Sequence, residues 1–285
     1  MSISEELGEL RTVRIPAGTI EYRERGSGPP IVFVHGVGVN GDLWRWVVPE
    51  LADRHRCIAP DLPLGAHAQP LREDAEMSLP ELARILADFL AALNLHDVAI
   101  VANDTGGAIA QWLAGHRAER VGALVLTSCD AFDRFPPRPQ RYLKLAARVP
   151  GALWLIAAAV QFRWVQRLRI AYGWATYDPI EPEIMRSYTE NVLRNRGVRR
   201  DLARLLRAVD TRYTFEAANA LRRFDKPALV AWAAGDKLFP IEHGRQLAAM
   251  LPRGRFTQIP DSRTFIPEDE PERLAALVRG FLSAA

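Results

Sequence analysis

The sequence predicts an α/β fold in which helices flank a mostly parallel sheet and a helical insertion covers one end of that sheet. Short apolar runs separated by helix-length segments are the first observation, because such runs are typical of strands buried on both faces. The second is residues 133–224, which are rich in Arg, Tyr and Trp, have helical periodicity and contain no convincing strand. The predicted core is residues 1–132 and 225–285, and the predicted cap is residues 133–224. The apolar runs are residues 31–34, 57–59, 98–102, 123–127, 228–232 and 256–259.

The composition is that of a globular protein. Of 285 residues, 48% are hydrophobic and 25% are charged, which excludes collagen-like, disordered and coiled-coil chains. The net charge is only +3, since 34 acidic residues nearly balance 37 basic ones, so we expect no nucleic-acid partner. The longest apolar stretch, residues 152–160, is far shorter than the roughly 20 residues that span a bilayer. With no signal pattern at the N-terminus, we expect a cytoplasmic protein without a membrane partner.

Several elements can be placed along the chain from local signals. Residues 10–15 and 19–25, joined by Pro-Ala-Gly, predict an antiparallel hairpin. Residues 78–81 have the spacing of a capping box and precede apolar positions that repeat at three and four residues, so a helix is expected to begin there. Further helices are expected from Gly106 and over residues 271–282.

The strongest motif is residues 98–107, Val-Ala-Ile-Val-Ala-Asn-Asp-Thr-Gly-Gly, in which a strand runs directly into a tight turn and a helix. Such an elbow holds its central residue, here Asp104, in a strained backbone conformation with the side chain exposed. The neighbours at 102 and 106 must be small to permit the turn. The helix that follows directs free backbone N–H groups at the site. We therefore predict Asp104 as the reactive residue.

With this elbow, the chain resembles the α/β-hydrolase superfamily over nearly its whole length. The resemblance implies an oxyanion loop at His35 and Gly36, with the backbone N–H groups of Val37 and Thr105 stabilising negative charge. Because the elbow residue is Asp, the chain is similar to haloalkane dehalogenases and epoxide hydrolases. In those enzymes the Asp attacks an alkyl carbon and a His-activated water breaks the ester. The other landmarks are Phe33-Val34-His35-Gly36, Asp61-Leu62-Pro63-Leu64-Gly65, residues 233–240 and Pro271-Glu272.

The same resemblance places the catalytic base just before the last helix, where this chain has Thr264. Thr cannot act as a general base near pH 7, and no His follows His243. His67, after the carboxyl end of a strand, is the one histidine considered as a displaced base. Asp236 occupies the usual triad-acid position, and Asp130 ends the strand before the insertion. Either acid could join the site or be a helix cap or ion-pair partner, and two close carboxylates would permit acid–base work.

Neither Asp-nucleophile subgroup is matched in full. Dehalogenases of this kind hold the halide with a Trp after the Asp and an Asn after His-Gly, where the chain has Thr105 and Val37. Epoxide hydrolases have His-Gly-x-Pro, where the chain has Gly38 in place of Pro. They also use cap tyrosines, and five of the six tyrosines lie in the predicted cap.

Three functions remain open from the sequence. The first is hydrolysis of an epoxide or alkyl halide through an Asp104 ester. The second is non-hydrolytic catalysis, such as isomerisation, cyclisation or elimination, with Asp104 as acid or base. The third is a ligand-binding protein that has kept the pocket and lost the chemistry.

Each function predicts an apolar, aromatic pocket lined by the insertion, Trp44 and Thr264, and a small or medium hydrophobic ligand. No metal or cofactor is expected, because His and Cys residues are few and scattered and no phosphate or dinucleotide motif occurs. The oligomeric state is left open.

Overall fold

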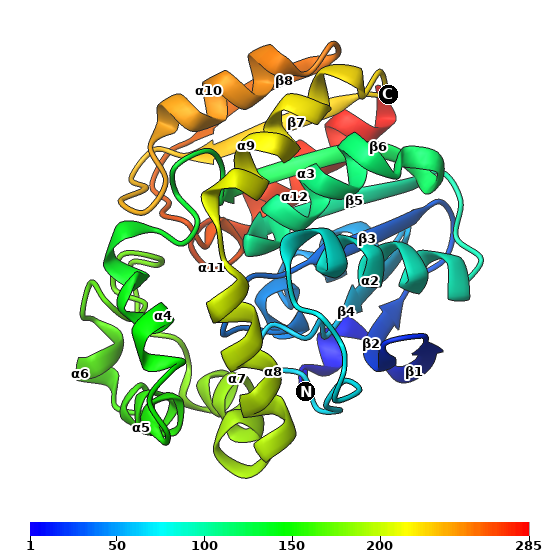
Figure 1. Cartoon of the computed structure of the whole chain (residues 1–285). Coiled ribbons are helices and arrows are strands. Elements are labelled where there is room, and N and C mark those ends of the chain that lie inside the picture. Colours follow the sequence, from blue (N-terminus) through cyan, green and yellow to red (C-terminus); the bar gives the residue numbers. More distant parts are fainter. Residues whose placement is uncertain (285) are drawn as a thin grey trace.

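The computed structural model describes residues 1–284 and contains one eight-stranded sheet with helices on both faces (Figure 1). The strands are β1 (Glu9–Ile15), β2 (Gly18–Arg25), β3 (Pro30–Val34), β4 (Arg56–Pro60), β5 (Val98–Asp104), β6 (Val121–Cys129), β7 (Ala228–Ala233) and β8 (Gly254–Ile259). Their order in the sheet is β1-β2-β4-β3-β5-β6-β7-β8. β2 is antiparallel to both β1 and β4, and all other neighbours are parallel. The predicted mostly parallel sheet is therefore confirmed.

Each apolar run that predicted a strand forms one. The strands β5 and β7 are buried along almost their whole length, because helices cover both faces of the sheet. The hairpin predicted before them is β1 and β2, in continuous antiparallel register from Glu9 opposite Glu24 to Ile15 opposite Gly18.

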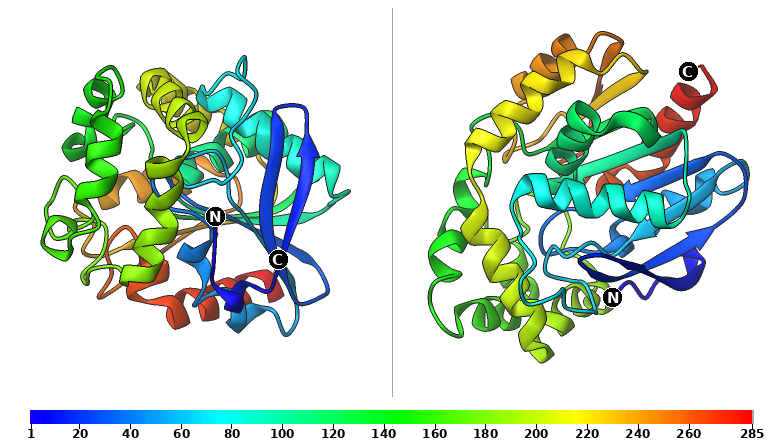
Figure 2. Two further views of the ribbon diagram at one scale, coloured as in Figure 1. Left: turned by 90° about the horizontal axis from the view of Figure 1, so that it is seen from below. Right: turned by 45° about the vertical axis from the view of Figure 1, so that its right-hand side comes forward.

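The helices outside the insertion flank the sheet in two groups (Figure 2). α2, α3, α9 and α10 contact one another in series on one face, while α1 packs against α12 on the other. The helices are α1 (Val48–Leu51), α2 (Leu79–Ala92), α3 (Thr105–His116), α4 (Tyr142–Ala146), α5 (Ala152–Ala159), α6 (Arg163–Gln166), α7 (Pro182–Arg194), α8 (Arg196–Ala208), α9 (Thr211–Ala220), α10 (Ile241–Met250), α11 (Ile266–Asp269) and α12 (Pro271–Ser283).

The helix predicted after residue 78 is α2, but the predicted capping box does not form. Ser78 occupies the N-cap position with extended backbone, yet its side chain makes no capping hydrogen bond. Pro80 lies in the first turn, and because proline has no N–H, one of the donors that a cap would satisfy is missing. The helix is held instead by its buried apolar face, which includes Leu82, Leu86 and Phe89.

The insertion between β6 and β7 is helical, as predicted. Helices α4 to α8 form a separate group beside the sheet, coloured green to yellow-green in Figure 1. α9 also belongs to residues 133–224, but it packs against the core helix α3. The exact division between core and cap stays a prediction.

Candidate functional site

The turn between β5 and α3 holds Asp104 in a conformation that few residues adopt. Its φ is 54° and its ψ is −131°, so the last residue of β5 is also the N-cap of α3. Glycines allow this close packing: a Cβ at Gly36 would lie 2.5 Å from the Cβ of Asp104, and a Cβ at Gly106 would collide with the carbonyl oxygen of Val34. The turn therefore depends on two neighbouring glycines as well as on Asp104.

Backbone N–H groups hold the Asp104 carboxylate. The N–H of Thr105 donates to Oδ1, and the N–H of Val37 also donates to the carboxylate. Burial raises the pKa of Asp104, and these hydrogen bonds oppose that rise because they stabilise the ionised form. Gly36 lies against Asp104, so the loop of residues 35–37 and the start of α3 together enclose this carboxylate.

Asp130 is linked to Asp104 through Thr105. The Thr105 hydroxyl donates to Asp130 Oδ2 at 2.7 Å, and the backbone N–H of the same residue donates to Asp104. Asp130 is 1% exposed, and burial, together with the charge of Asp104, raises its pKa well above the ordinary value. Asp130 therefore holds its proton to a higher pH than an ordinary aspartate does, and Thr105 hydrogen-bonds both carboxyl groups, Asp104 through its backbone N–H and Asp130 through its hydroxyl.

Thr264 hydrogen-bonds the acid in the loop after β7. Its hydroxyl donates to Asp236 Oδ1 at 2.9 Å, and the N–H groups of Leu238 and Phe239 donate to the same oxygen at 2.8 and 2.9 Å. Burial raises the pKa of Asp236 to about 6. The Thr264 carbonyl accepts from Asn103 Nδ2 at 2.7 Å, which ties this loop to the residue before Asp104.

His35 and His67 hydrogen-bond parts of the chain outside the cavity. His35 Nε2 accepts from the N–H of Leu62 at 2.9 Å, and its Nδ1 lies 2.9 Å from the Gly36 carbonyl oxygen. Burial lowers the pKa of His35 to about 4, so it is a neutral residue that joins two loops. His67 Nε2 lies 3.4 Å from Asp201 Oδ2 on α8, and burial lowers its pKa. Among residues 1–284, no histidine lines the cavity beside Asp104.

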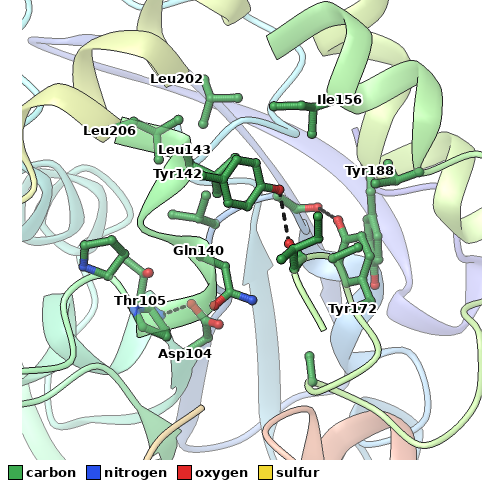
Figure 3. A pocket seen from close by; sticks show the side chains of 18 of the residues that line it. Asp104, Thr105, Gln140, Tyr142, Leu143, Ile156, Tyr172, Tyr188, Leu202 and Leu206 are labelled. Carbon is green, nitrogen blue, oxygen red and sulfur yellow. Dashed lines mark hydrogen bonds between the residues drawn. The ribbon is translucent and has the colours of Figure 1, made fainter. Parts of the chain in front are cut away.

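A cavity of about 170 Å³ opens above Asp104 (Figure 3). It is slightly larger than the roughly 150 Å³ cavity that holds benzene, so it has room for a hydrophobic ligand of at least that size. Val37 and Thr105 line it, whereas Trp44 and Thr264 are not among the lining residues of the described chain. Trp44 packs against Phe33 with ring centroids 5.3 Å apart. Most of the apolar wall comes from the cap, including Leu143, Leu153, Ile156, Val160, Leu202 and Leu206.

Five polar side chains that the sequence did not single out face this cavity, namely those of Gln140, Tyr142, Tyr172, Tyr188 and Thr189. Gln140 lies beside Asp104, and Tyr172 and Tyr188 lie together on another side (Figure 3). The hydroxyl of Tyr172 donates to the Gly38 carbonyl at 2.8 Å, and that of Tyr142 donates to the Ile170 carbonyl at 3.1 Å. Gln140 Oε1 and the Tyr188 hydroxyl are buried without a hydrogen-bond partner among the described residues. Only the richness of the cap in tyrosine signalled this set, and nothing distinguished Gln140.

Comparison with known proteins identifies the class. The family model for the α/β hydrolase fold matches residues 29–271, and the chain belongs to this family. Haloalkane dehalogenase 2 of Mycobacterium tuberculosis is 29% identical over 275 residues, covering 92% of this chain and 90% of that protein. A cis-3-alkyl-4-alkyloxetan-2-one decarboxylase of Xanthomonas campestris is 29% identical over 297 residues, covering 94% and 93%. The crystal structure of an ancestral haloalkane dehalogenase superposes with a TM-score of 0.79 at 26% identity, covering 96% and 99%.

Proposed function

We propose that this protein is an enzyme in which Asp104 attacks an electrophilic carbon of a small or medium hydrophobic substrate. The observation that carries the proposal is the geometry of Asp104: backbone N–H groups hold its carboxylate, and the residue borders a mostly apolar cavity. Holding Oδ1 orients the second oxygen for attack, and the low polarity of the cavity favours a nucleophile stripped of water.

The first step forms an ester. The Asp104 oxygen bonds to the substrate carbon as the bond between that carbon and its leaving atom breaks, and the electron pair of the broken bond stays with the leaving atom. Water then adds to the ester carbonyl, the alcohol leaves, and Asp104 returns as a carboxylate with the release of one proton. The N–H groups of Val37 and Thr105 would stabilise the negative charge on the carbonyl oxygen in this second step.

The polar groups of the cavity favour an oxygen leaving group over a halide. Gln140 and Tyr188 each bring a buried polar atom without a partner in the described chain, and a ligand oxygen could accept from the Tyr188 O–H, while Gln140 Oε1 could accept from the hydroxyl group of the ring-opened ligand. The side chains of Val37 and Thr105 provide no N–H group for a halide ion. An epoxide of short or medium alkyl chain is therefore the proposed substrate class.

Ester breakdown is the slow step of this scheme. Thr264 occupies the hydrogen-bonding place beside Asp236, and no histidine of the described residues reaches the cavity. Ester formation neutralises Asp104, which removes one of the two causes of the raised pKa of Asp130. The pKa of Asp130 therefore falls when the ester forms, and Asp130 can then release its proton. We propose that the resulting carboxylate is the weak base for the hydrolytic step and acts through the Thr105 hydroxyl.

Turnover assays test the proposal. Terminal alkyl epoxides from butyl to octyl, and 1-bromoalkanes of the same lengths, are incubated with the protein and with Asp104→Asn. We expect epoxide consumption that falls at least about a thousandfold in Asp104→Asn, since the amide is a poor nucleophile. The matched control is Asp74→Asn, an exposed aspartate paired with Arg72. Equal turnover by Asp104→Asn would refute the proposal.

A second candidate is a reaction that consumes no water, namely decarboxylation of an oxetan-2-one. The absence of a cavity histidine among residues 1–284 favours it, as does the relative named for this activity. Asp104 would attack the saturated ring carbon that is bonded to the ring oxygen. The ring then opens to an ester of Asp104 and a free carboxylate. Loss of CO₂ then forms the carbon–carbon double bond and expels Asp104 as carboxylate, so neither a base nor a water is required.

Isotope labelling separates the two candidates. In H₂¹⁸O, hydrolysis through the ester places ¹⁸O in the Asp104 carboxylate after one turnover and in the product after further turnovers. Decarboxylation yields an alkene and CO₂ and leaves Asp104 unlabelled. An alkene from a dialkyl oxetan-2-one without diol formation from epoxides would favour the second candidate.

A further inference from the structure

The outer side of the cap carries a cluster of exposed apolar side chains. We call residues 141–170, which include α4, α5 and α6, the outer cap face (Figure 1). Its largest apolar side chains are strongly exposed, with values of 63% for Leu155, 60% for Phe162 and 67% for Trp164. Leu145, Val149 and Trp154 are exposed as well. Scattered apolar residues are ordinary, but a group of this size on one short segment marks an interaction surface.

The outer cap face and the residues on either side of it are strongly cationic. Residues 134–177 contain eight Lys or Arg residues and no Asp or Glu. Arg134 and Arg138 lie near Asp133, just before the outer cap face. In contrast, the arginines of the outer cap face are exposed and form no ion pair with a residue of the described chain; they are Arg141, Arg148, Arg163, Arg167 and Arg169.

A cationic groove of about 580 Å³ borders this face, between the α4–α5 connection and α8. Its basic lining residues include Arg148, Arg196 and Arg207. Val149 and Trp154 line the same groove, so guanidinium groups and exposed apolar side chains are direct neighbours there. Such a pairing of Arg with Trp and aliphatic groups suits an anionic head group attached to an apolar chain.

We propose that the outer cap face binds the surface of a bilayer that contains anionic lipids. The arginines would contact phosphate groups while the Trp, Phe and Leu side chains enter the boundary of the acyl chains. A second copy of the chain is a poorer partner, because a symmetric contact would bring these arginines together with no acidic residue to pair them. Within the described part of the chain, no helix has the length and apolarity to cross a membrane, and an interfacial position requires none.

The proposal also gives the cavity an access route. One side of α5 carries Leu153 and Ala157, which line the cavity, and the other carries the exposed Trp154 and Leu155. The helix that would touch the bilayer is therefore a wall of the cavity, and an apolar ligand dissolved in the bilayer would lie next to it. Membrane binding itself does not depend on the chemistry of Asp104.

Vesicle co-sedimentation tests the proposal on the full-length protein. The probes are vesicles of equimolar phosphatidylcholine and phosphatidylglycerol, with vesicles of pure phosphatidylcholine for comparison. We expect binding to the anionic vesicles that weakens with added salt. Arg163→Gln with Arg167→Gln should weaken it about fivefold for each arginine removed, whereas Arg14→Gln with Arg223→Gln, exposed arginines elsewhere, should leave it unchanged.

The apolar contribution needs its own variants. Phe162→Ala with Trp164→Ala should reduce binding at least about tenfold, while Phe215→Ala, which is 52% exposed on α9, should not. Because all these side chains are exposed, unchanged thermal unfolding shows that the variants remain folded. Absence of binding to anionic vesicles, or binding equal in the outer-cap and control variants, would overturn the proposal. Concentration-dependent dimers abolished by Phe162→Ala with Trp164→Ala would assign the face to self-association instead.

Discussion

At the scale of single residues, Asp104 and Asp130 are two neighbouring carboxyl groups in different environments. Asp104 is half-buried and receives backbone hydrogen bonds, whereas Asp130 is fully buried with one hydroxyl partner and a neighbouring negative charge. The pKa of Asp130 is therefore raised more than that of Asp104. Of the two carboxyl groups, Asp130 is therefore the one that keeps its proton to the higher pH.

This division predicts the pH dependence of the first step. Attack requires ionised Asp104, whose pKa is raised, so kcat/KM should fall with acid at a higher pH than for an ordinary aspartate. Because the pKa of Asp130 is raised more than that of Asp104, we expect Asp130 to stay protonated through this limb and Asp130→Asn to leave the position of the limb unchanged. A shift of more than about half a pH unit, measured in the pH profile of kcat/KM, would show that Asp130 is charged there.

The sequence identified Asp104 because an elbow has local requirements that can be read from neighbouring residues. It did not identify Gln140 or the free hydroxyl of Tyr188, because both reach the cavity only through the folding of the cap. His67 was chosen from its place after the carboxyl end of a strand, and Trp44 as an aromatic residue for the pocket lining. The structure directs His67 to Asp201 and Trp44 to Phe33, and strand position alone does not specify the direction of a side chain.

At the scale of elements, the strand β5, the elbow and the helix α3 form a rigid support that depends on close backbone contact. The strands were predictable because buried parallel strands are continuously apolar. The capping box predicted at Ser78 does not form, although the helix does. Pro80 removes one backbone donor, and burial of the apolar face is sufficient to hold α2.

Substitution of Gly36 tests this support. Gly36→Ala places a methyl group 2.5 Å from the Cβ of Asp104, so we expect a loss of about 1–3 kcal/mol in the free energy of unfolding and a large loss of activity. The matched control is Gly280→Ala in α12, where a Cβ meets nothing within 4 Å. That change should be neutral or stabilise by up to about 1 kcal/mol, measured by urea unfolding. Equal effects of the two substitutions would contradict the role of Gly36.

At the scale of the whole molecule, a buried ion pair joins distant parts of the chain. Arg45 lies just after the 3₁₀ turn Gly41–Trp44, and both of its terminal nitrogens donate to Glu268 on α11, at 2.7 and 2.8 Å. The two side chains are 5% and 10% exposed. Sequence patterns gave no sign of this pair, because its partners are separated by 223 positions.

Breaking the pair from one side should cost much more than breaking a surface pair. Glu268→Gln leaves the Arg45 charge buried and uncompensated, so we expect a loss of roughly 3–5 kcal/mol in the free energy of unfolding. Asp74→Asn breaks the exposed pair with Arg72 and should cost less than about 1 kcal/mol. Denaturant unfolding of both variants provides the comparison, and similar losses would contradict a stabilising role for the buried pair.

The exposure and positive charge of the outer cap face were not predicted from the sequence. Helical periodicity in residues 133–224 indicated amphipathic helices, but it cannot distinguish a face that packs on the core from one that stays exposed. The net charge of the chain is small, so the local excess of arginine in residues 134–177 is hidden in the total.

The most direct measurement of the central claim is the mass of the peptide that contains Asp104. The protein is incubated with an alkyl epoxide, quenched in acid and digested, and the peptide is analysed by mass spectrometry. An ester on Asp104 predicts a mass increase equal to that of the epoxide, which is absent in Asp104→Asn and accumulates further in Asp130→Asn. Steady turnover of the epoxide with an unmodified Asp104 peptide at every quench time would contradict a covalent role for Asp104.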